Sequence, residues 1–110
     1  MKNWDLGAFE EVVLMVIGIL GEEAYGVTIR KELEKHTKKR PSIGALHSAL
    51  YRLEGKTYVK SFEAGATAAR GGRRKRFYEI TAAGKEALLK AHSMRMNMLD
   101  LIPDLDLGDA

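Results

Sequence analysis

The sequence contains no cysteine and only two prolines in 110 residues. The absence of cysteine excludes a disulfide-stabilised fold and a thiolate metal site. The main apolar run, residues 12–20, has nine residues, whereas a helix needs about 20 to span a membrane. Acidic residues on both sides of this run argue against a secretion signal. We therefore expect a core helix in a cytoplasmic protein.

Positive charge is concentrated in two short segments, although the net charge is only +3. Residues 30–40 contain six Lys and Arg residues, and residues 70–76 contain five. From Asp100 onward there are four Asp residues and no Lys or Arg. Local positive charge of this kind is typical of a surface that binds an anionic polymer. Residues 103–110 are expected to form an acidic tail.

The spacing of apolar residues predicts three helices, then a β-hairpin, then a fourth helix. Gly21 ends the first helix, Pro41 separates the second helix from the third, and Ser42 and Thr81 are expected to cap the two helices that follow them. The predicted ranges are 9–20, 25–36 and 42–56 for the first three helices, 57–63 and 74–81 for the strands, and 82–102 for the last helix.

The third predicted helix has one apolar and one polar side. At 100° per residue, Ile43, Leu46, Leu50 and Leu53 form one narrow stripe, which we expect to be buried. On the polar side Arg52 is the single cation, and it has no acidic neighbour on that side. The rest of the polar side consists of small and hydrogen-bonding side chains, which can contact phosphates or base edges. The candidate DNA-binding residues of this helix are Ser42, His47, Ser48, Tyr51 and Arg52.

The second predicted strand follows directly on the basic segment 70–76. Alternation directs Tyr78 and Ile80 toward the core, and the cations lie further out. Three helices followed by a basic hairpin describe a winged helix-turn-helix, in which the hairpin, called the wing, contacts the sugar–phosphate backbone. The candidate wing contacts are Arg70, Arg73, Arg74, Lys75 and Arg76.

Four segments together resemble the PadR family of transcriptional regulators, in its short form with a single C-terminal helix. They are LGAFEEVVLMVI (6–17), AYGVTIRKELE (24–34), SIGALHSALYRLEGKTYV (42–59) and GGRRKRFYEITAAGKEAL (71–88). The resemblance implies an α+β, mostly α fold, with a winged helix-turn-helix domain at 1–81 and a dimerisation helix at 82–102. It also implies that the third helix enters the major groove of double-stranded DNA. We expect a homodimeric repressor that binds a palindromic operator.

Three positions depart from the family pattern. His47 stands where the family usually has tyrosine, and Arg74 stands where it commonly has proline. The turn glycine that usually precedes the first strand of the wing falls at Gly55 rather than next to Val59. We therefore expect that turn to differ in shape from the usual turn of the family.

The last predicted helix carries an apolar seam with 4-3-4-3 spacing, which we expect to pair with a second copy of the chain, helped by the first helix. The seam consists of Ala87, Ala91, Met94, Met98 and Leu101. No aromatic residue follows Tyr78. Any effector is therefore expected to be a small apolar compound bound between Trp4 and the two methionines Met94 and Met98.

An enzyme and a single-stranded nucleic-acid or RNA binder are the alternatives. The three histidines lie on three different predicted helices and lack the HxxxH spacing of a metal site. The sequence also lacks a GxSxG elbow and a phosphate-binding loop, so we expect no catalytic residue, metal or cofactor. The RGG segment at 70–72 also occurs in proteins that bind single strands or RNA. Its single occurrence favours duplex DNA and leaves that alternative open.

Overall fold

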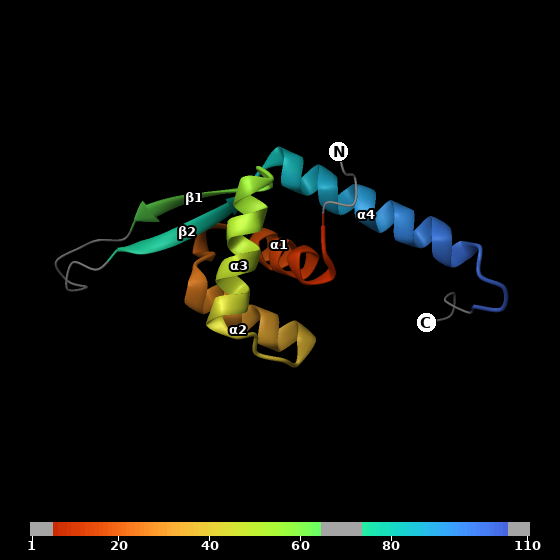
Figure 1. Ribbon diagram of the computed structural model, residues 1–110, viewed down its shortest axis with the longest axis horizontal. Coiled ribbons are helices and arrows are strands. Elements are labelled where there is room, and N and C mark those ends of the chain that lie inside the picture. Colours follow the sequence, from red (N-terminus) through yellow and green to blue (C-terminus); the bar gives the residue numbers. More distant parts are fainter. Residues whose placement is uncertain (1–5, 65–73, 106–110) are drawn as a thin grey trace.

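The computed structural model describes residues 6–64 and 74–105. Its elements follow the predicted order, with one added turn of 3-10 helix after the first helix. They are α1 (Ala8–Leu20), η1 (Gly21–Glu23), α2 (Gly26–Thr37), α3 (Ile43–Gly55), β1 (Val59–Ala64), β2 (Lys75–Ile80) and α4 (Ala82–Asp100). Figure 1 shows α1, α2 and α3 packed together, with the hairpin projecting from one side and α4 from the other. The predicted fold, mostly helical α+β of the winged-helix type with a C-terminal helix, is confirmed.

The core lies where α1 meets α2 and α3. Its fully buried side chains are Val13, Leu14, Val16 and Ile17 of α1, Ile29 and Leu33 of α2, and Leu46, Ala49, Leu50 and Leu53 of α3. The prediction that Ile43 belongs to this stripe is wrong, because its side chain is 56% exposed. The buried arc of α3 is centred on Leu46 and Leu53. Ala49 falls within this arc, and Ile43 lies at its margin in the first turn.

The hairpin is a two-stranded antiparallel sheet in which Val59 pairs with Ile80 and Glu63 pairs with Arg76. Before it, Thr57 takes a left-handed conformation with φ of 66°. This is a conformation that glycine adopts more readily than threonine, so a threonine here holds a position of the turn that would suit glycine. Thr81 then stabilises the base of the hairpin, because its Oγ1 donates a hydrogen bond to the Thr57 carbonyl at 2.7 Å.

α4 begins in close contact with the base of the hairpin. The Thr81 Oγ1 accepts a hydrogen bond from the Gly84 N–H at 3.0 Å, which confirms the predicted cap. A Cβ added to Gly84 would lie 2.3 Å from the Tyr58 carbonyl oxygen, so only glycine fits at this position without displacing the backbone. The outer part of α4 projects away from α2 and α3, as Figure 1 shows, while Arg95 still pairs with Glu11 of α1. No helix in the described part of the chain is long and apolar enough to cross a membrane.

Candidate nucleic-acid interface

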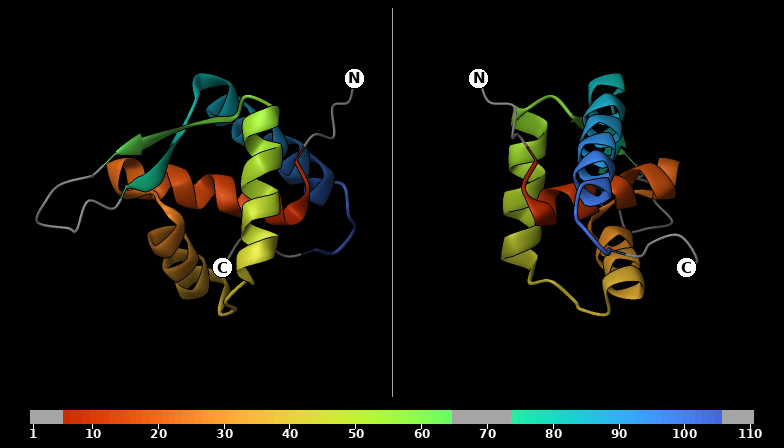
Figure 2. Two further views of the ribbon diagram at one scale, coloured as in Figure 1. Left: turned by 60° about the vertical axis from the view of Figure 1, so that its left-hand side comes forward. Right: turned by 90° about the vertical axis from the view of Figure 1, so that its right-hand side faces the viewer.

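The outer side of α3 is exposed and carries most of the DNA-binding residues predicted for this helix. His47, Ser48 and Tyr51 are all exposed, and the Tyr51 side chain is 80% accessible. In the left-hand view of Figure 2, α3 stands in front of the other elements. The Ser42 Oγ accepts a hydrogen bond from the Ala45 N–H at 3.0 Å. Ser42 is thus the N-cap of α3, and it lies at the end that helix-turn-helix proteins direct into the groove.

Arg52 was predicted to be a cation without an acidic neighbour on its side of α3. In the structure it has an acidic partner on another helix. Its Nε lies 2.5 Å from Oε2 of Glu10 on α1, and the Lys56 Nζ lies 2.7 Å from Oε1 of the same carboxylate. The sequence did not indicate this contact, since Glu10 lies 42 residues away and the apolar pattern of α1 gives no sign of a buried acid. Half of the Arg52 side chain stays exposed.

The carboxylate of Glu10 is buried and held ionised by its partners. Burial by itself raises the pKa of Glu10, but hydrogen bonds from Lys56, Arg52 and the Gly7 N–H outweigh it, so the pKa lies below its ordinary value. The same carboxylate therefore anchors the C-terminal end of α3 to α1. It also sets where the Arg52 and Lys56 side chains lie.

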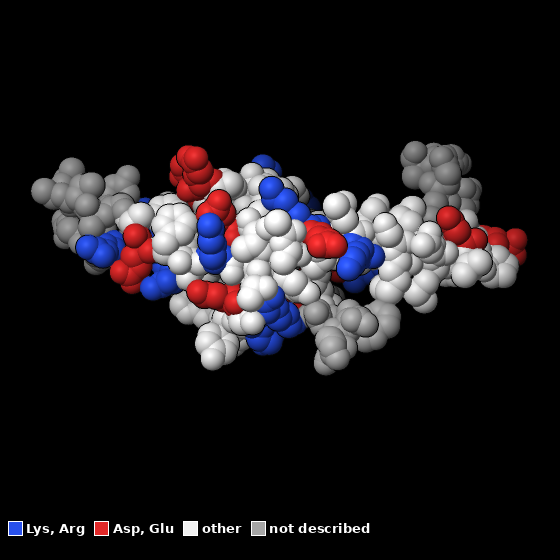
Figure 3. All heavy atoms as spheres, turned by 90° about the horizontal axis from the view of Figure 1, so that it is seen from above, with Lys and Arg blue, Asp and Glu red and all other residues white. Residues whose placement is uncertain are grey.

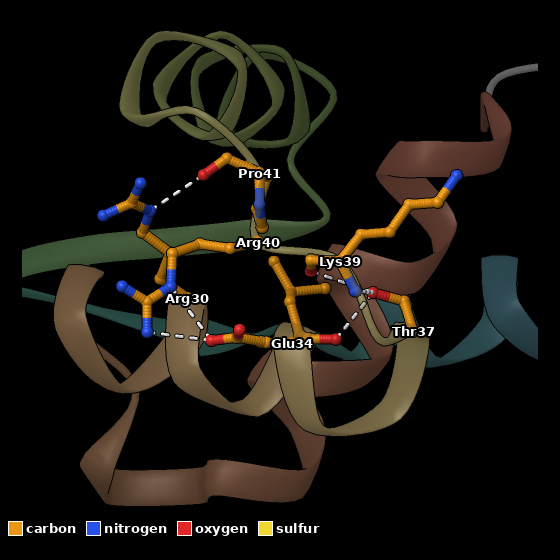
Figure 4. A network of polar contacts seen from close by, with 7 residues as sticks. Arg30, Glu34, Thr37, Lys39, Arg40 and Pro41 are labelled. Carbon is orange, nitrogen blue, oxygen red and sulfur yellow. Dashed lines mark hydrogen bonds and ion pairs between the residues drawn. The ribbon is translucent and has the colours of Figure 1, made fainter.

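Two arginines organise the turn between α2 and α3. The Arg30 Nε donates a hydrogen bond to the Pro41 carbonyl at 2.8 Å. The Arg40 Nη2 lies 2.8 Å from Oε1 of Glu34 on α2. Figure 4 shows both guanidinium groups on the same side of the turn. The cationic cluster at 30–40 is thus partly used to hold α3 against α2.

The described wing cations lie beside an acid or an aromatic ring. Arg76 donates to the Ser61 Oγ at 2.8 Å and to Oε2 of Glu63 at 3.2 Å, and the Arg74 Nη1 lies 3.7 Å from Oε1 of Glu63. The Lys75 Nζ sits 4.1 Å from the centroid of the Tyr25 ring. Figure 3 shows positive and negative side chains next to each other on the hairpin. The predicted contacts Arg70 and Arg73 lie outside the described residues.

Two exposed apolar residues border the outer side of α3. Val27, in the first turn of α2, is 57% exposed, and Ile43 is the first residue of α3. Together they line a cleft between the N-terminal ends of the two helices. Ile43 was predicted to lie in the core, and Val27 was not among the predicted residues. The signal that could have identified them is an apolar residue in the first turn of each helix.

The predicted seam on α4 divides into two parts. Ala87, Ala91 and Met94 are half-buried within the chain, whereas Met98 and Leu101 are exposed. The exposed Leu89 and Met96 were not predicted. In Figure 3 the surface over the outer part of α4 is largely uncharged, with acidic side chains at its far end.

The predicted effector site cannot be placed, because Trp4 lies outside the described residues. A hollow of 790 Å³ lies elsewhere, where the hairpin meets α1 and the start of α4. Two aromatic side chains line it: Phe62 and Phe77, which stack with their ring centroids 5.9 Å apart. The aromatic rings that α4 lacks are thus supplied by the wing. Among the residues that the structure describes, no group of three or more acidic or histidine side chains could hold a metal ion.

Comparison with known proteins agrees with this geometry. The family model described as "Transcriptional regulator PadR-like family" matches residues 13–90. The chain belongs to the PadR-like family. The match runs from α1 through the wing into α4, so it includes the exposed side of α3 and the described wing cations. Members of this family are DNA-binding transcriptional regulators, which excludes the enzyme alternative.

Solved structures give the same assignment, and no curated protein matches the chain significantly. A PadR family transcription regulator from hypervirulent Clostridium difficile is 25% identical with a TM-score of 0.69, and the match covers 84% of this chain and 92% of that one. A transcriptional regulator from Clostridium thermocellum is 25% identical with a TM-score of 0.65, covering 88% and 89%. The complex structure of hsRosR-S4, a form of RosR from H. salinarum, is 27% identical with a TM-score of 0.68, covering 91% and 79%.

Proposed function

We propose that this PadR-like protein is a sequence-specific repressor that binds a palindromic DNA operator as a homodimer. The observation that carries the proposal is the division of α3 into two sides. Leu46, Leu50 and Leu53 are buried, and the opposite side presents an imidazole, a hydroxyl and a phenol to solvent. These groups can form hydrogen bonds with base edges, and α3 holds them rigidly because its other side is packed.

The described wing cations support binding to the backbone of the same duplex. Arg74 and Arg76 are exposed on the hairpin, next to the segment 65–73 that contains the remaining predicted cations. Their partner Glu63 is itself about half exposed, so water screens these ion pairs and phosphates can replace the carboxylate at low cost. The wing can therefore supply the sequence-independent part of the affinity.

The exposed apolar part of α4 supports a homodimer. Leu89, Met98 and Leu101 are 67%, 60% and 81% exposed, and α1 adds the exposed Ile19. A soluble protein seldom leaves this much apolar surface on one helix without a partner. A second copy offers the same surface, which is the requirement for a two-fold symmetric interface, and two-fold symmetry corresponds to a palindromic site.

Selection of bound duplexes from a random pool tests the proposal, followed by affinity measurements on duplex DNA, its single strands and the matching RNA at one salt concentration. A specific repressor should recover a palindromic sequence and bind that duplex at least about a thousandfold more tightly than unrelated duplexes. Comparable binding to all three nucleic acids would favour the single-strand or RNA alternative. Transcription from a promoter that carries the recovered site should fall when the protein is added, and a rise would show an activator.

Variants separate the two parts of the interface. Arg74→Ala with Arg76→Ala should weaken binding to all duplexes alike and reduce the log–log salt slope by about 0.9 for each lost phosphate contact. Ser48→Ala should instead change the sequence preference. The control pair Lys85→Ala and Lys90→Ala removes the same charge from the exposed surface of α4 and should leave the slope unchanged. A wing variant with full affinity and an unchanged slope would contradict the role of the wing.

A further inference from the structure

The cleft between the N-terminal ends of α2 and α3 is apolar inside and basic at its rim. Its volume is 260 Å³, and Val27, Ile43 and the buried Leu46 line it. Arg30, Lys31 and Arg40 also border it. The two exposed apolar side chains at its mouth are not needed for the core, which is complete without them.

We propose that this cleft is a binding site for the 5-methyl group of a thymine, and that Ile43 and Val27 contribute to sequence specificity through it. The inference rests on the proposed DNA-binding mode. In helix-turn-helix proteins the N-terminal residues of the recognition helix contact base edges, and Ile43 is the first residue of α3. The thymine methyl is the group in the major groove that favours contact with apolar side chains.

The charges at the rim favour this ligand over an apolar segment of another protein. In the major groove the methyl group of thymine lies on the side of the base next to the phosphates of its own strand. Within the described part of the chain, neither Arg30 nor Lys31 pairs with a carboxylate. Arg30 is oriented by its hydrogen bond to Pro41 (Figure 4). A methyl group beside a phosphate fits an apolar cleft with a cationic rim, whereas an apolar peptide would bury these cations without compensation.

Replacement of thymine by uracil tests the inference, because it removes the methyl group and leaves every hydrogen-bonding group of the base in place. Each thymine of the selected operator is replaced in turn, and the Kd of the full-length protein is measured at one salt concentration. At one thymine in each half-site, uracil should raise the Kd about fourfold, the effect of about one methyl group returned to water. The Ile43→Ala variant should bind the thymine and uracil duplexes equally at that position, and Val27→Ala should show a reduced difference.

Ile19→Ala is the matched control, since Ile19 is an equally exposed isoleucine on α1. Whatever its absolute affinity, this variant should keep the fourfold ratio between the two duplexes. Thermal unfolding of each variant checks that the fold is retained, as expected for exposed positions. The inference is overturned if no replacement raises the wild-type Kd twofold, or if Ile43→Ala responds as the wild type does. A protein that prefers no duplex sequence would instead overturn the proposed function itself.

Discussion

α3 and α4 place their apolar residues in opposite ways. α3 has 13 residues and buries Leu46, Ala49, Leu50 and Leu53 within the chain. α4 has 19 residues, and among those described only Gly84 is buried. α3 therefore turns a polar side to solvent, while α4 leaves large apolar side chains, among them Leu89 and Met98, exposed. The difference fits the two partners proposed above: a polar polymer for α3, and a second copy of the chain for α4.

α1 connects both helices through two adjacent acids. The Glu10 carboxylate contacts Arg52 and Lys56 of the α3 end, while the Arg95 Nη1 of α4 lies 2.6 Å from Oε1 of Glu11. Consecutive residues on a helix point about 100° apart, so two neighbouring carboxylates can reach two different helices. Both carboxylates are buried, which makes α1 the shared support of α3 and α4.

Charges placed on the outer part of α4 should have the largest effect. In the proposed dimer, Met98→Glu with Leu101→Glu would put four carboxylates into the symmetric interface and remove the burial of four apolar side chains. The dimer should weaken by at least about 4 kcal/mol, and sedimentation should show a monomer that binds the operator weakly. Unfolding of the protomer should change little, because both side chains are exposed within it.

Lys35→Ala with Lys60→Ala is the control for this change in net charge. Both lysines are exposed and lie outside α4. This variant should remain a dimer. If the variant with both glutamates remains a dimer, the interface lies on another surface, and the contrast between the two helices does not hold.

The junction between the hairpin and α4 should be the next most sensitive feature. Gly84→Ala would bring a Cβ to 2.3 Å from the Tyr58 carbonyl, so α4 must shift, and we expect a loss of about 3 kcal/mol in the free energy of unfolding. Gly55→Ala at the end of α3 is the matched control, because no atom lies within 4 Å of the added Cβ. Urea unfolding should show this control to be neutral or slightly stabilising. Equal effects of the two substitutions would mean that the close approach of α4 is not required.

Glu10→Gln tests the link between α1 and α3. It leaves Arg52 and Lys56 without their buried counter-charge, so we expect the free energy of unfolding to fall at neutral pH. The loss should be only about 2 kcal/mol, because both cations can be partly rehydrated. The pKa of Glu10 lies below its ordinary value of 4.5 in the folded state, so its contribution is present above pH 4.5 and is lost as the pH falls through the lowered pKa. The difference in the free energy of unfolding between this variant and the wild type should therefore shrink below pH 4.5.

Glu79→Gln is the control for the pH experiment. Glu79 is exposed on the hairpin, with its Oε1 3.8 Å from the Lys60 Nζ. Its replacement should lower the free energy of unfolding by less than about 0.5 kcal/mol. Urea unfolding at a series of pH values compares the two variants with the wild type. A Glu10 variant whose deficit is constant down to pH 3 would show that the ionised carboxylate is not what holds α3.

The regular elements could be predicted from the sequence because their signals are local. Apolar spacing, the caps Ser42 and Thr81, and the break at Pro41 depend on neighbouring residues, and the structure confirms each of them. The position of Ile43 was wrong because helical spacing gives the direction of a side chain but not where the neighbouring helix ends. The resemblance to the PadR family carried the functional assignment.

The ion pairs could not be predicted in the same way. The contact between Glu10 and Arg52 joins residues 42 positions apart, and no local pattern identifies which acid is buried. The pairing of Glu63 with Arg76 depends on the register of the hairpin, which a long loop leaves undetermined in the sequence. Counting cations therefore overestimated the free positive charge, because it did not show which carboxylates lie beside them.

The smallest predicted effect concerns this partial neutralisation of the wing. Glu63→Gln would remove the carboxylate that contacts Arg74 and Arg76, so that phosphates no longer compete with it for these cations. Exposed ion pairs are weak, and we expect operator binding to tighten only about twofold in low salt and by less as salt screens the charges. Glu86→Gln on α4 makes the same change in net charge beside Lys90 and should leave the affinity unchanged. Weaker binding of the Glu63 variant would instead show that the carboxylate orients Arg76 for its phosphate contact, and would make it part of the interface rather than a competitor for it.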